Sequence, residues 1–367
     1  MKMLSSLRVV EISGLGPGPF CAMHLADLGA DVISVSRPQE KDTKSILYRG
    51  KRSVVADLKT AEGKRLVEGL LKDADVLIEG MRPGVMERLG LGPEDCHRIN
   101  PRLVYGRMTG WGQEGPLAHA AGHDNNYISV SGALWHSGQP DTPPLTPFAA
   151  VGDIGGGAMY LAVGILSGVL NARQTGKGTV IDAAIVDGSA HMLNLLLKAQ
   201  STGHVNDERG TSIHDSSPFY QTYECADGQY ITLGSIEPQF YALLLNMLGL
   251  EQDDLFKDRQ WDRAVWGAQR ARLADIIRTK SQAEWQTLFE GSDVCFGVVL
   301  SPSGAARHPH NQARGVYFER DGVLQASPAP RFDGKAYTPG TVAALGQHTK
   351  EIQEALAKGD AGAVWLS

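Results

Sequence analysis

Hydrophobic and polar positions follow two periods in the first third of this chain of 367 residues. Short runs rich in Val, Ile and Leu alternate with longer stretches whose apolar residues recur at helical spacing. The expected strands are 7–12, 31–35, 53–57, 76–78 and 103–108, and the expected helices between them include 19–28 and 61–72. Strands that alternate with helices are typical of βαβ units. The pattern therefore predicts an α/β domain with a doubly wound parallel sheet, which binds ligands at the carboxyl ends of its strands.

The middle of the chain is more apolar. Ile154–Arg173 predicts a long central helix that ends at Gly176–Gly178, and a strand at Val180–Ala184 and a helix at Gly188–Gln200 follow. The most apolar run, Ala158–Leu170, has about 13 residues, whereas a membrane-spanning helix needs about 20. We therefore expect a buried core helix and no membrane span.

The pattern changes after residue 201. The polar, glycine-containing stretch 202–217 is the expected linker, and Asp227-Gly228 between two short apolar runs predicts a β-hairpin. The remaining expected elements are helices at 239–248, 265–280 and 349–357, a strand at 294–300 and a second hairpin at 316–324. The expected organisation is a large Rossmann-like domain at 1–201, the linker at 202–217, a small α+β domain at 218–325, and a return to the large domain at 326–367.

Composition narrows the class of protein. Hydrophobic residues make up 42% and charged residues 21% of the chain, as in ordinary globular proteins, and the net charge of -6 argues against nucleic acid as a partner. The four cysteines, Cys21, Cys96, Cys225 and Cys295, form no C-x-x-C pair, so a zinc site or dithiol redox chemistry is not expected. The first residues run directly into a strand without a signal-peptide pattern, and we expect a cytoplasmic protein.

A local basic cluster contrasts with the acidic chain. Between Arg37 and Arg65 there are nine Lys or Arg residues against four Asp or Glu. This local charge of +5 favours an anionic ligand such as a phosphate, although a solvated basic surface is the alternative. The loop 14–18, Gly-Leu-Gly-Pro-Gly, loosely resembles a dinucleotide fingerprint. Since Pro19 interrupts that pattern and the next strand ends at Arg37 rather than at an acidic residue, a tight strand-to-helix turn is favoured over an NADP site.

Two polar segments hold candidate acid/base residues. The first is 122–127, Gly-His-Asp-Asn-Asn-Tyr, and the second is 151–157, Val-Gly-Asp-Ile-Gly-Gly-Gly. Asp153 is expected to open the central helix, where it is either a helix cap or a reactive carboxylate, and the glycines after it could expose N–H groups to an anionic oxygen. His123 is either structural or a base near neutral pH. A base on each face of a carbon atom is what inversion of that carbon requires, and exposed N–H groups would stabilise the enolate that forms when the atom lies beside a thioester carbonyl.

Sequence spacing alone does not predict that His123 and Asp153 lie at one site, but a family resemblance does. The chain resembles the class III CoA-transferase superfamily and, within it, the α-methylacyl-CoA racemase branch. The resemblance covers nearly the whole chain, and the motifs that carry it are 28–33 with Arg37, 49–53, 57–59, 82–90, 109–112, 122–127, 308–311 and 328–332.

The resemblance implies a class III CoA-transferase fold, in which two chains interlock as a homodimer with the active site between the large domain of one and the small domain of the other. It implies that His123 and Asp153 are the acid/base pair, with His123 provisionally on the face of the S-substrate, and that Glu237 supports the pair across the dimer. It also implies sites for the substrate: Arg37, Ala56, Asp57, Leu58, Lys59, Gly80, Met81, Arg82 and Arg88 for coenzyme A, and Gly122, Asp124, Asn125, Asn126 and Tyr127 for the pantetheine and the thioester.

The expected activity is interconversion of (R)- and (S)-2-methylacyl-CoA thioesters. Coenzyme A enters as part of the substrate, so no cofactor and no metal are expected. Transfer of CoA between carboxylic acids through an acyl-enzyme at Asp153 is the alternative, and members of that branch typically lack a histidine matching His123. A non-catalytic CoA-thioester binding protein is a third hypothesis. The two asparagines at 125 and 126 stand where racemases often have aliphatic residues, which bears on the choice of acyl group.

Overall fold

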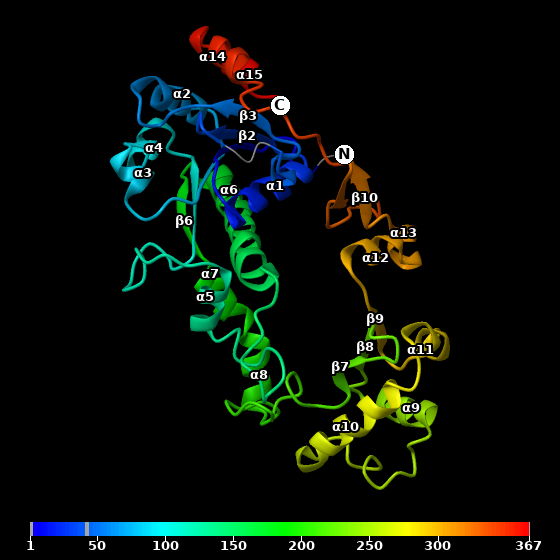
Figure 1. Ribbon diagram of the computed structural model, residues 1–367. Coiled ribbons are helices and arrows are strands. Elements are labelled where there is room, and N and C mark those ends of the chain that lie inside the picture. Colours follow the sequence, from blue (N-terminus) through cyan, green and yellow to red (C-terminus); the bar gives the residue numbers. More distant parts are fainter. Residues whose placement is uncertain (1–2, 41–43, 367) are drawn as a thin grey trace. The chain divides into compact units, whose positions relative to one another are not determined.

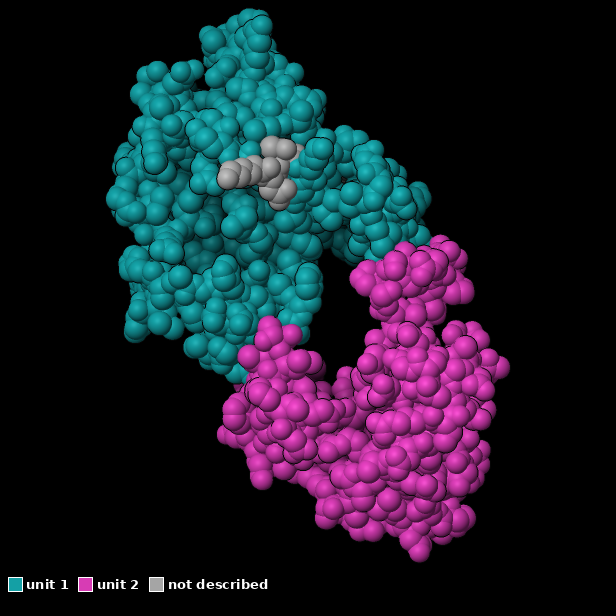
Figure 2. Space-filling model, in the orientation of Figure 1, with its two compact units in different colours: residues 1–132, 147–192, 315–367 teal, residues 133–146, 193–314 magenta. Residues whose placement is uncertain are grey.

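A computed structural model describes residues 3–40 and 44–366, and the chain divides into two compact units (Figure 2). Unit 1 comprises Met1–Gly132, Pro147–Met192 and Gly315–Ser367, and unit 2 comprises Ala133–Thr146 and Leu193–Arg314. This division differs in detail from the expected domains, because the stretch 133–146 joins unit 2 and the hairpin after residue 315 joins unit 1. Each unit contains a hydrophobic core of its own.

Unit 1 is built on a six-stranded parallel sheet in the order β3-β2-β1-β4-β5-β6. The strands are β1 (Arg8–Ile12), β2 (Asp31–Ser36), β3 (Arg52–Val55), β4 (Val76–Glu79), β5 (Val104–Thr109) and β6 (Thr179–Ala184). All six lie within a residue or two of the expected strands, since runs of β-branched residues fit a sheet that is buried on both faces. The α/β class with a parallel sheet is confirmed.

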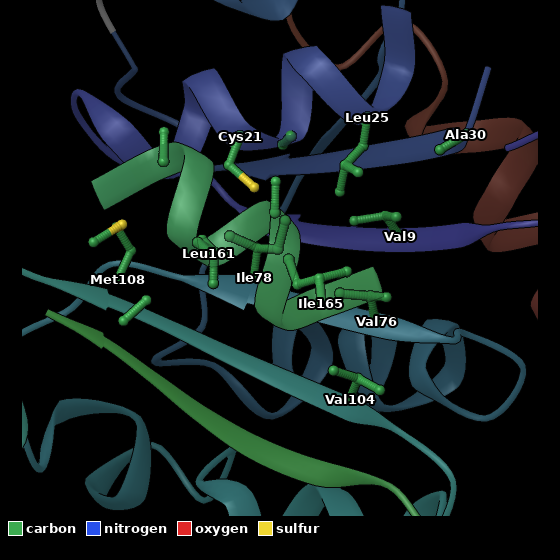
Figure 3. Packing of buried hydrophobic residues seen from close by; sticks show 14 of the residues in the cluster. Val9, Cys21, Leu25, Ala30, Val76, Ile78, Val104, Met108, Leu161 and Ile165 are labelled. Atoms are coloured by element: carbon green, nitrogen blue, oxygen red, sulfur yellow. The ribbon is translucent and has the colours of Figure 1, made fainter. Parts of the chain in front are cut away.

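Helices cover both faces of this sheet (Figure 1). On one face, Val9 of β1 and Val104 of β5 belong to the same buried cluster as Leu25 of α1 (Pro17–Asp27) and Leu161 of α6 (Met159–Thr175), as Figure 3 shows. On the other face, alternate strand residues pack with α2 (Ala61–Leu71), α4 (Pro93–Ile99) and α14 (Thr349–Ala357). Because side chains alternate along a strand, one strand serves both layers.

The central helix is longer than expected. It begins with a π-helical stretch, η2 (Ala150–Ala158), and continues without interruption as α6. Within the described part of the chain, this stretch of 26 residues is the one helix that is long and apolar enough to cross a membrane, judged by length and composition. Of its most apolar window, 44% is buried inside the structure. Core helices of soluble proteins meet the same criteria, so a single stretch of this kind is weak evidence for a membrane span.

The C-terminal part of unit 1 packs back onto its first strands and helices. Arg49 bonds Asp27 through two nitrogens and also reaches the side chain of Gln325 in β11 (Val323–Ala326), which pairs with β10 (Tyr317–Arg320). Near the end of the chain, the backbone N–H of Leu366 donates to Asp31. The short helix α15 (Ala361–Val364) lies between α14 and this contact.

Unit 2 contains the antiparallel sheet β7-β8-β9 with helices packed on one face. Its strands are β7 (Tyr220–Glu224), β8 (Tyr230–Gly234) and β9 (Phe296–Val299), and its longer helices are α8 (Asn194–Ser201), α9 (Pro238–Leu248), α10 (Trp266–Ile277) and α11 (Gln282–Phe289). The hairpin expected at Asp227-Gly228 is confirmed. The expected linker 202–217 is part of this unit, where the fully buried Asp215 pairs with His136 and accepts backbone N–H groups of Gly210 and Ser212.

Candidate active site

The carboxyl edge of the parallel sheet collects most of the predicted site residues. The loop 14–18 follows β1, Arg37 follows β2, the segment 56–59 follows β3, and the segment 80–82 follows β4. Because parallel strands all end at the same edge, residues that are distant in sequence meet there. Arg37, Lys59, Arg82 and Arg88 are exposed, so their charges are available to a ligand.

Part of the basic cluster has a structural role. Three of its nine cations are buried in ion pairs of unit 1: Arg49 with Asp27, Lys51 with Glu11 at 2.7 Å, and Arg52 with Asp31 at 2.8 Å. A buried charge is tolerated when an opposite charge and hydrogen bonds compensate its lost hydration. These three cations are therefore engaged in ion pairs within unit 1, and the cations that can meet an anion are the exposed ones around them.

His123 stands at the start of helix α5 (Asp124–Ser131). Its backbone N–H donates to the side-chain oxygen of Asn126 at 3.0 Å, which closes the first turn of the helix. The Tyr127 hydroxyl donates to the carbonyl of Gly122, and its ring meets the Trp111 ring edge-on at 4.8 Å. The segment 122–127 is thus fixed by its own side chains, while the imidazole of His123 is exposed.

Asp153 lies inside the π-helical turn η2 and does not open the helix. The expectation of a helix cap at Asp153 is wrong, because the helix begins three residues earlier at Ala150. π-Helical turns are rare and occur frequently at functional sites, since the extra residue per turn redirects a side chain. The carboxylate of Asp153 is half-buried and stands 3.4 Å from the point that a Cβ atom on Gly16 would occupy. Gly16 (φ 66°) immediately precedes α1, so the start of α1 lies beside Asp153 of η2.

Asp124 joins the two candidate bases. Its side chain is buried, and one oxygen accepts the backbone N–H of Asp153 at 2.6 Å. The other oxygen has no hydrogen-bond partner among the described residues. The two residues are 29 positions apart in the sequence, and their hydrogen bond fixes η2 against the start of α5. The structure shows that the Asp124 carboxylate bonds the backbone of η2, and contact of Asp124 with the substrate stays a prediction.

The glycines of η2 serve packing. A Cβ atom on Gly152 would stand 2.3 Å from the Asp124 carboxylate, and one on Gly156 would stand 2.4 Å from the Ser189 hydroxyl of α7 (Ile185–Met192). Gly157 is buried against the Ile185 side chain in the same way. That the N–H groups after Asp153 meet an anionic oxygen stays a prediction. The glycines allow η2 to approach α5 and α7 closely.

The charges of the site act on one another. Burial, followed by the negative charge of Asp124, raises the pKa of Asp153 above its ordinary value, while His123 has the opposite effect. Burial and the charge of Asp153 also raise the pKa of Tyr127, against the influence of Arg82. The two effects show that His123, Asp124, Tyr127, Arg82 and Asp153 share one electrostatic environment. A carboxylate with a raised pKa is suited to exchanging protons.

Glu237 belongs to unit 2, where it immediately precedes α9 after the end of β8. Its charge contributes to raising the pKa of Cys295, whose first cause is burial, so the carboxylate and the thiol are neighbours in this unit. All four cysteines are free, and three of them are buried. Within residues 3–40 and 44–366, no group of three or more His, Cys, Asp or Glu side chains is arranged to hold a metal ion.

Sequence reasoning did not select two buried residues beside the site. Glu79 and Arg107 stand next to each other on β4 and β5 and bond one another. The sequence around each residue predicts a strand. The pattern of a buried strand does not indicate whether a charged residue within it has a partner. A charged residue at the last position of an apolar run, as in the segment Val-Leu-Ile-Glu of β4, is the signal that was available.

Comparison with known proteins agrees with this architecture. The sequence profile of CoA-transferase family III matches residues 4–349, and the chain belongs to this family. Human alpha-methylacyl-CoA racemase is 42% identical over 357 residues, which cover 96% of this chain and 92% of that protein. The mouse protein of the same name is 41% identical over 356 residues, 95% of this chain and 92% of that one. The crystal structure of a CAIB/BAIF family protein from Brucella suis matches 97% of this chain and 99% of its own with a TM-score of 0.82 and 28% identity.

Proposed function

We propose that this protein is a racemase that interconverts (R)- and (S)-2-methylacyl-CoA thioesters by proton transfer at the carbon next to the thioester carbonyl. The observation that carries the proposal is the pairing of an imidazole and a carboxylate at one site, His123 at the start of α5 and Asp153 in η2, in a chain 42% identical to a racemase of this class. A second observation is that both segments are fixed by hydrogen bonds, one from the His123 N–H to the Asn126 side chain and one from the Asp153 N–H to the Asp124 side chain.

In this proposal each base serves one face of the substrate carbon. One residue removes the α-proton, which the thioester acidifies, and the other returns a proton to the opposite face. The raised pKa of Asp153 supports this role, because the group then binds and releases a proton with similar ease closer to neutral pH. The amino end of α1 begins beside the Asp153 carboxylate, and its positive dipole end favours the negative charge of the enolate.

We propose that the coenzyme A part of the substrate binds along the same edge of the sheet, where several cations are exposed. Arg37, Lys59, Arg82 and Arg88 are proposed to bind its phosphates, with the segments 56–59 and 80–82 around the nucleotide. The proposed reaction needs no cofactor, since proton transfer beside a thioester requires only two bases and a stabilised enolate. The strand order β3-β2-β1-β4-β5-β6 of unit 1 supports a Rossmann-like sheet and the proposed nucleotide site.

We also propose an interlocked homodimer in which Glu237 of one chain supports the pair His123 and Asp153 of the other. Large apolar side chains exposed on α6, including Val163 and Leu170, support a surface that is covered in the assembly. Light scattering during size-exclusion chromatography is expected to give twice the monomer mass of 39.4 kDa. A monomer that is fully active would contradict this assembly.

The test of the function is proton NMR of the two isomers in deuterium oxide. (S)- and (R)-2-methylacyl-CoA are each incubated with the enzyme, and the expected result is loss of the α-proton from both isomers with convergence to one mixture. Absence of exchange from either isomer, with a folded sample and several acyl lengths, would overturn the proposal.

Transfer of CoA through Asp153 is a second candidate function, because the family that the chain belongs to is named for that reaction. A transferase forms an acyl anhydride and then a thioester on the carboxylate. Hydroxylamine or borohydride would trap these species, and mass spectrometry would find the label on Asp153. A racemase forms no covalent enzyme intermediate, so no label is expected here.

Substituting Asp124 by Asn is expected to shift the pH profile of the reaction. The carboxylate of Asp124 raises the pKa of Asp153, and Asn removes the charge while it keeps an oxygen that can accept the N–H of Asp153. The pKa of Asp153 is then lower, so Asp153 stays ionised, and active as a base, at lower pH. The acidic limb of kcat/KM, for the isomer that Asp153 deprotonates, is expected to move to lower pH.

The control for this substitution is the other direction of the reaction. The profile for the isomer that His123 deprotonates is expected to move less, because the pKa of Asp153 does not set its acidic limb. Identical profiles for wild type and Asp124→Asn in both directions would show that the charge of Asp124 does not tune Asp153.

A further inference from the structure

Glu79 and Arg107 form a buried ion pair at the carboxyl edge of the sheet. Glu79 is the last residue of β4, and Arg107 lies directly opposite it on β5. Both residues are buried, and the Nε of Arg107 donates to Oε1 of Glu79 at 3.1 Å. The guanidinium group also lies over the ring of Tyr105. Nothing in the proposed chemistry uses either residue.

The pair bonds both ends of the segment that follows β4. At the first end, Oε2 of Glu79 accepts the backbone N–H of Met81 at 2.6 Å. At the second end, Nη1 of Arg107 bonds Glu87 at 2.8 Å on the short helix α3 (Val85–Arg88). The segment 80–88 is therefore attached to two adjacent strands through one charged network.

This segment holds two of the exposed cations at the edge. Arg82 lies in the turn after β4, and Arg88 is the last residue of α3, with its guanidinium 3.1 Å from the point that a Cβ atom on Gly84 would occupy. Gly84 has a φ of 78°, so the turn requires glycine at this position. A flexible cation binds a phosphate weakly unless its backbone is already in place, because ordering it on binding costs free energy.

We propose that Glu79 and Arg107 are positioning residues that hold Arg82 and Arg88 in place for the phosphates of the coenzyme A group. The inference rests on the proposed function, since it assumes that the ligand carries this nucleotide. Neither residue touches the substrate. Their effect is on binding of the nucleotide part and not on proton transfer at the far end of the thioester.

The ionisation of Glu79 supports this role. Burial raises the pKa of Glu79 to about 7, although the Met81 N–H and Arg107 oppose that shift. The groups that face Glu79 are Arg107 and Tyr105 on β5, Glu87 on α3 and Cys96 on α4. As the pH falls through 7, Glu79 takes up a proton and its bond to Arg107 loses one charge. The network is therefore weakened below neutral pH.

The test compares two thioesters with the substitution Glu79→Gln. One is a 2-methylacyl-CoA, and the other is the same acyl group on pantetheine, which lacks the nucleotide and its phosphates. Glu79→Gln is expected to raise KM for the CoA thioester about tenfold, the usual consequence of losing one charge-assisted hydrogen bond, with kcat nearly unchanged. KM for the pantetheine thioester is expected to stay the same, whereas general damage to the fold would affect both substrates. The KM of wild type for the CoA thioester is also expected to rise more from pH 8 to pH 6 than that of the variant.

The matched control is Asp31→Asn, which neutralises another buried carboxylate paired with an arginine. Asp31 and Arg52 are the first residues of β2 and β3, so they lie at the amino end of the sheet, away from the segment 80–88. This variant is expected to lose stability without a selective rise in KM for the CoA thioester. Equal effects of Asp31→Asn and Glu79→Gln on KM would overturn the inference.

Glu87→Gln provides a second variant in case Glu79→Gln fails to fold. The Glu87 side chain is 43% exposed, so we expect the fold to tolerate this substitution. The substitution removes the ion pair between Arg107 and α3. A smaller rise in KM, again confined to the CoA thioester, is expected. An unchanged KM in both variants, with wild type active, would refute the positioning role and leave the racemase function standing. If wild type shows no exchange, the function fails, and calorimetric titration of both variants with free coenzyme A still tests the segment.

Discussion

Asp153→Asn is expected to lower the rate of racemisation about 10³-fold while the protein stays folded. General acid/base groups typically contribute 10²- to 10⁴-fold to a rate, and a two-base mechanism has no substitute for one missing base. The remaining base still removes a proton from its own face. Asp153→Asn is therefore expected to exchange the α-proton of one isomer only, provisionally the S-isomer, and His123→Gln that of the other. Proton NMR in deuterium oxide measures exchange and inversion in the same sample.

The stability of Asp153→Asn provides the control. Because burial and Asp124 raise the pKa of Asp153, its ionised form weakens the fold at pH values above that pKa, and the destabilisation disappears when the group is protonated at lower pH. Asn carries no charge, so the free energy of unfolding at neutral pH is expected to equal or exceed that of wild type. A folded Asp153→Asn that inverts both isomers at the wild-type rate would rule out Asp153 as a base.

Gly188→Ala is expected to destabilise the protein by about 3 kcal/mol, the upper part of the usual range for inserting a group into a packed core. A Cβ atom on Gly188 of α7 would stand 1.9 Å from the carbonyl oxygen of Gly156 in η2, so one of the two helices must move. Since η2 carries Asp153, the movement also displaces a proposed catalytic group. Thermal and urea unfolding, followed by circular dichroism, are expected to show the lower free energy of unfolding. A separate activity assay is expected to show a lower kcat.

The matched control for this substitution is Gly267→Ala in α10. Gly267 is exposed and has no atom within 4 Å of an added Cβ, and Ala is a better helix residue than Gly by about 0.5–1 kcal/mol. This variant is expected to be as stable as wild type or slightly more stable. If Gly188→Ala behaved like Gly267→Ala, the close approach of η2 and α7 would not be needed for the fold.

The sequence by itself determined the parallel sheet and the hairpin of unit 2. The strands are short runs rich in β-branched residues and bounded by turns, and these local signals suffice when a strand is buried on both faces. The motif 122–127 and the aspartate at 153 also identified the candidate bases from residue types and family resemblance. The roles assigned to these residues and to the coenzyme A segments stay predictions, which the substitutions above test.

Only the tertiary structure decided how the site is supported. Helical periodicity does not reveal that η2 is a π-helix, or that the carboxylate of Asp124 holds the N–H of Asp153 29 residues away. It also does not distinguish the buried cations Arg49, Lys51 and Arg52 from the exposed ones beside them. The physical reason is the same in each case. Burial, pairing and raised pKa values arise from contacts between segments distant in sequence, and such contacts exist only once the chain has folded.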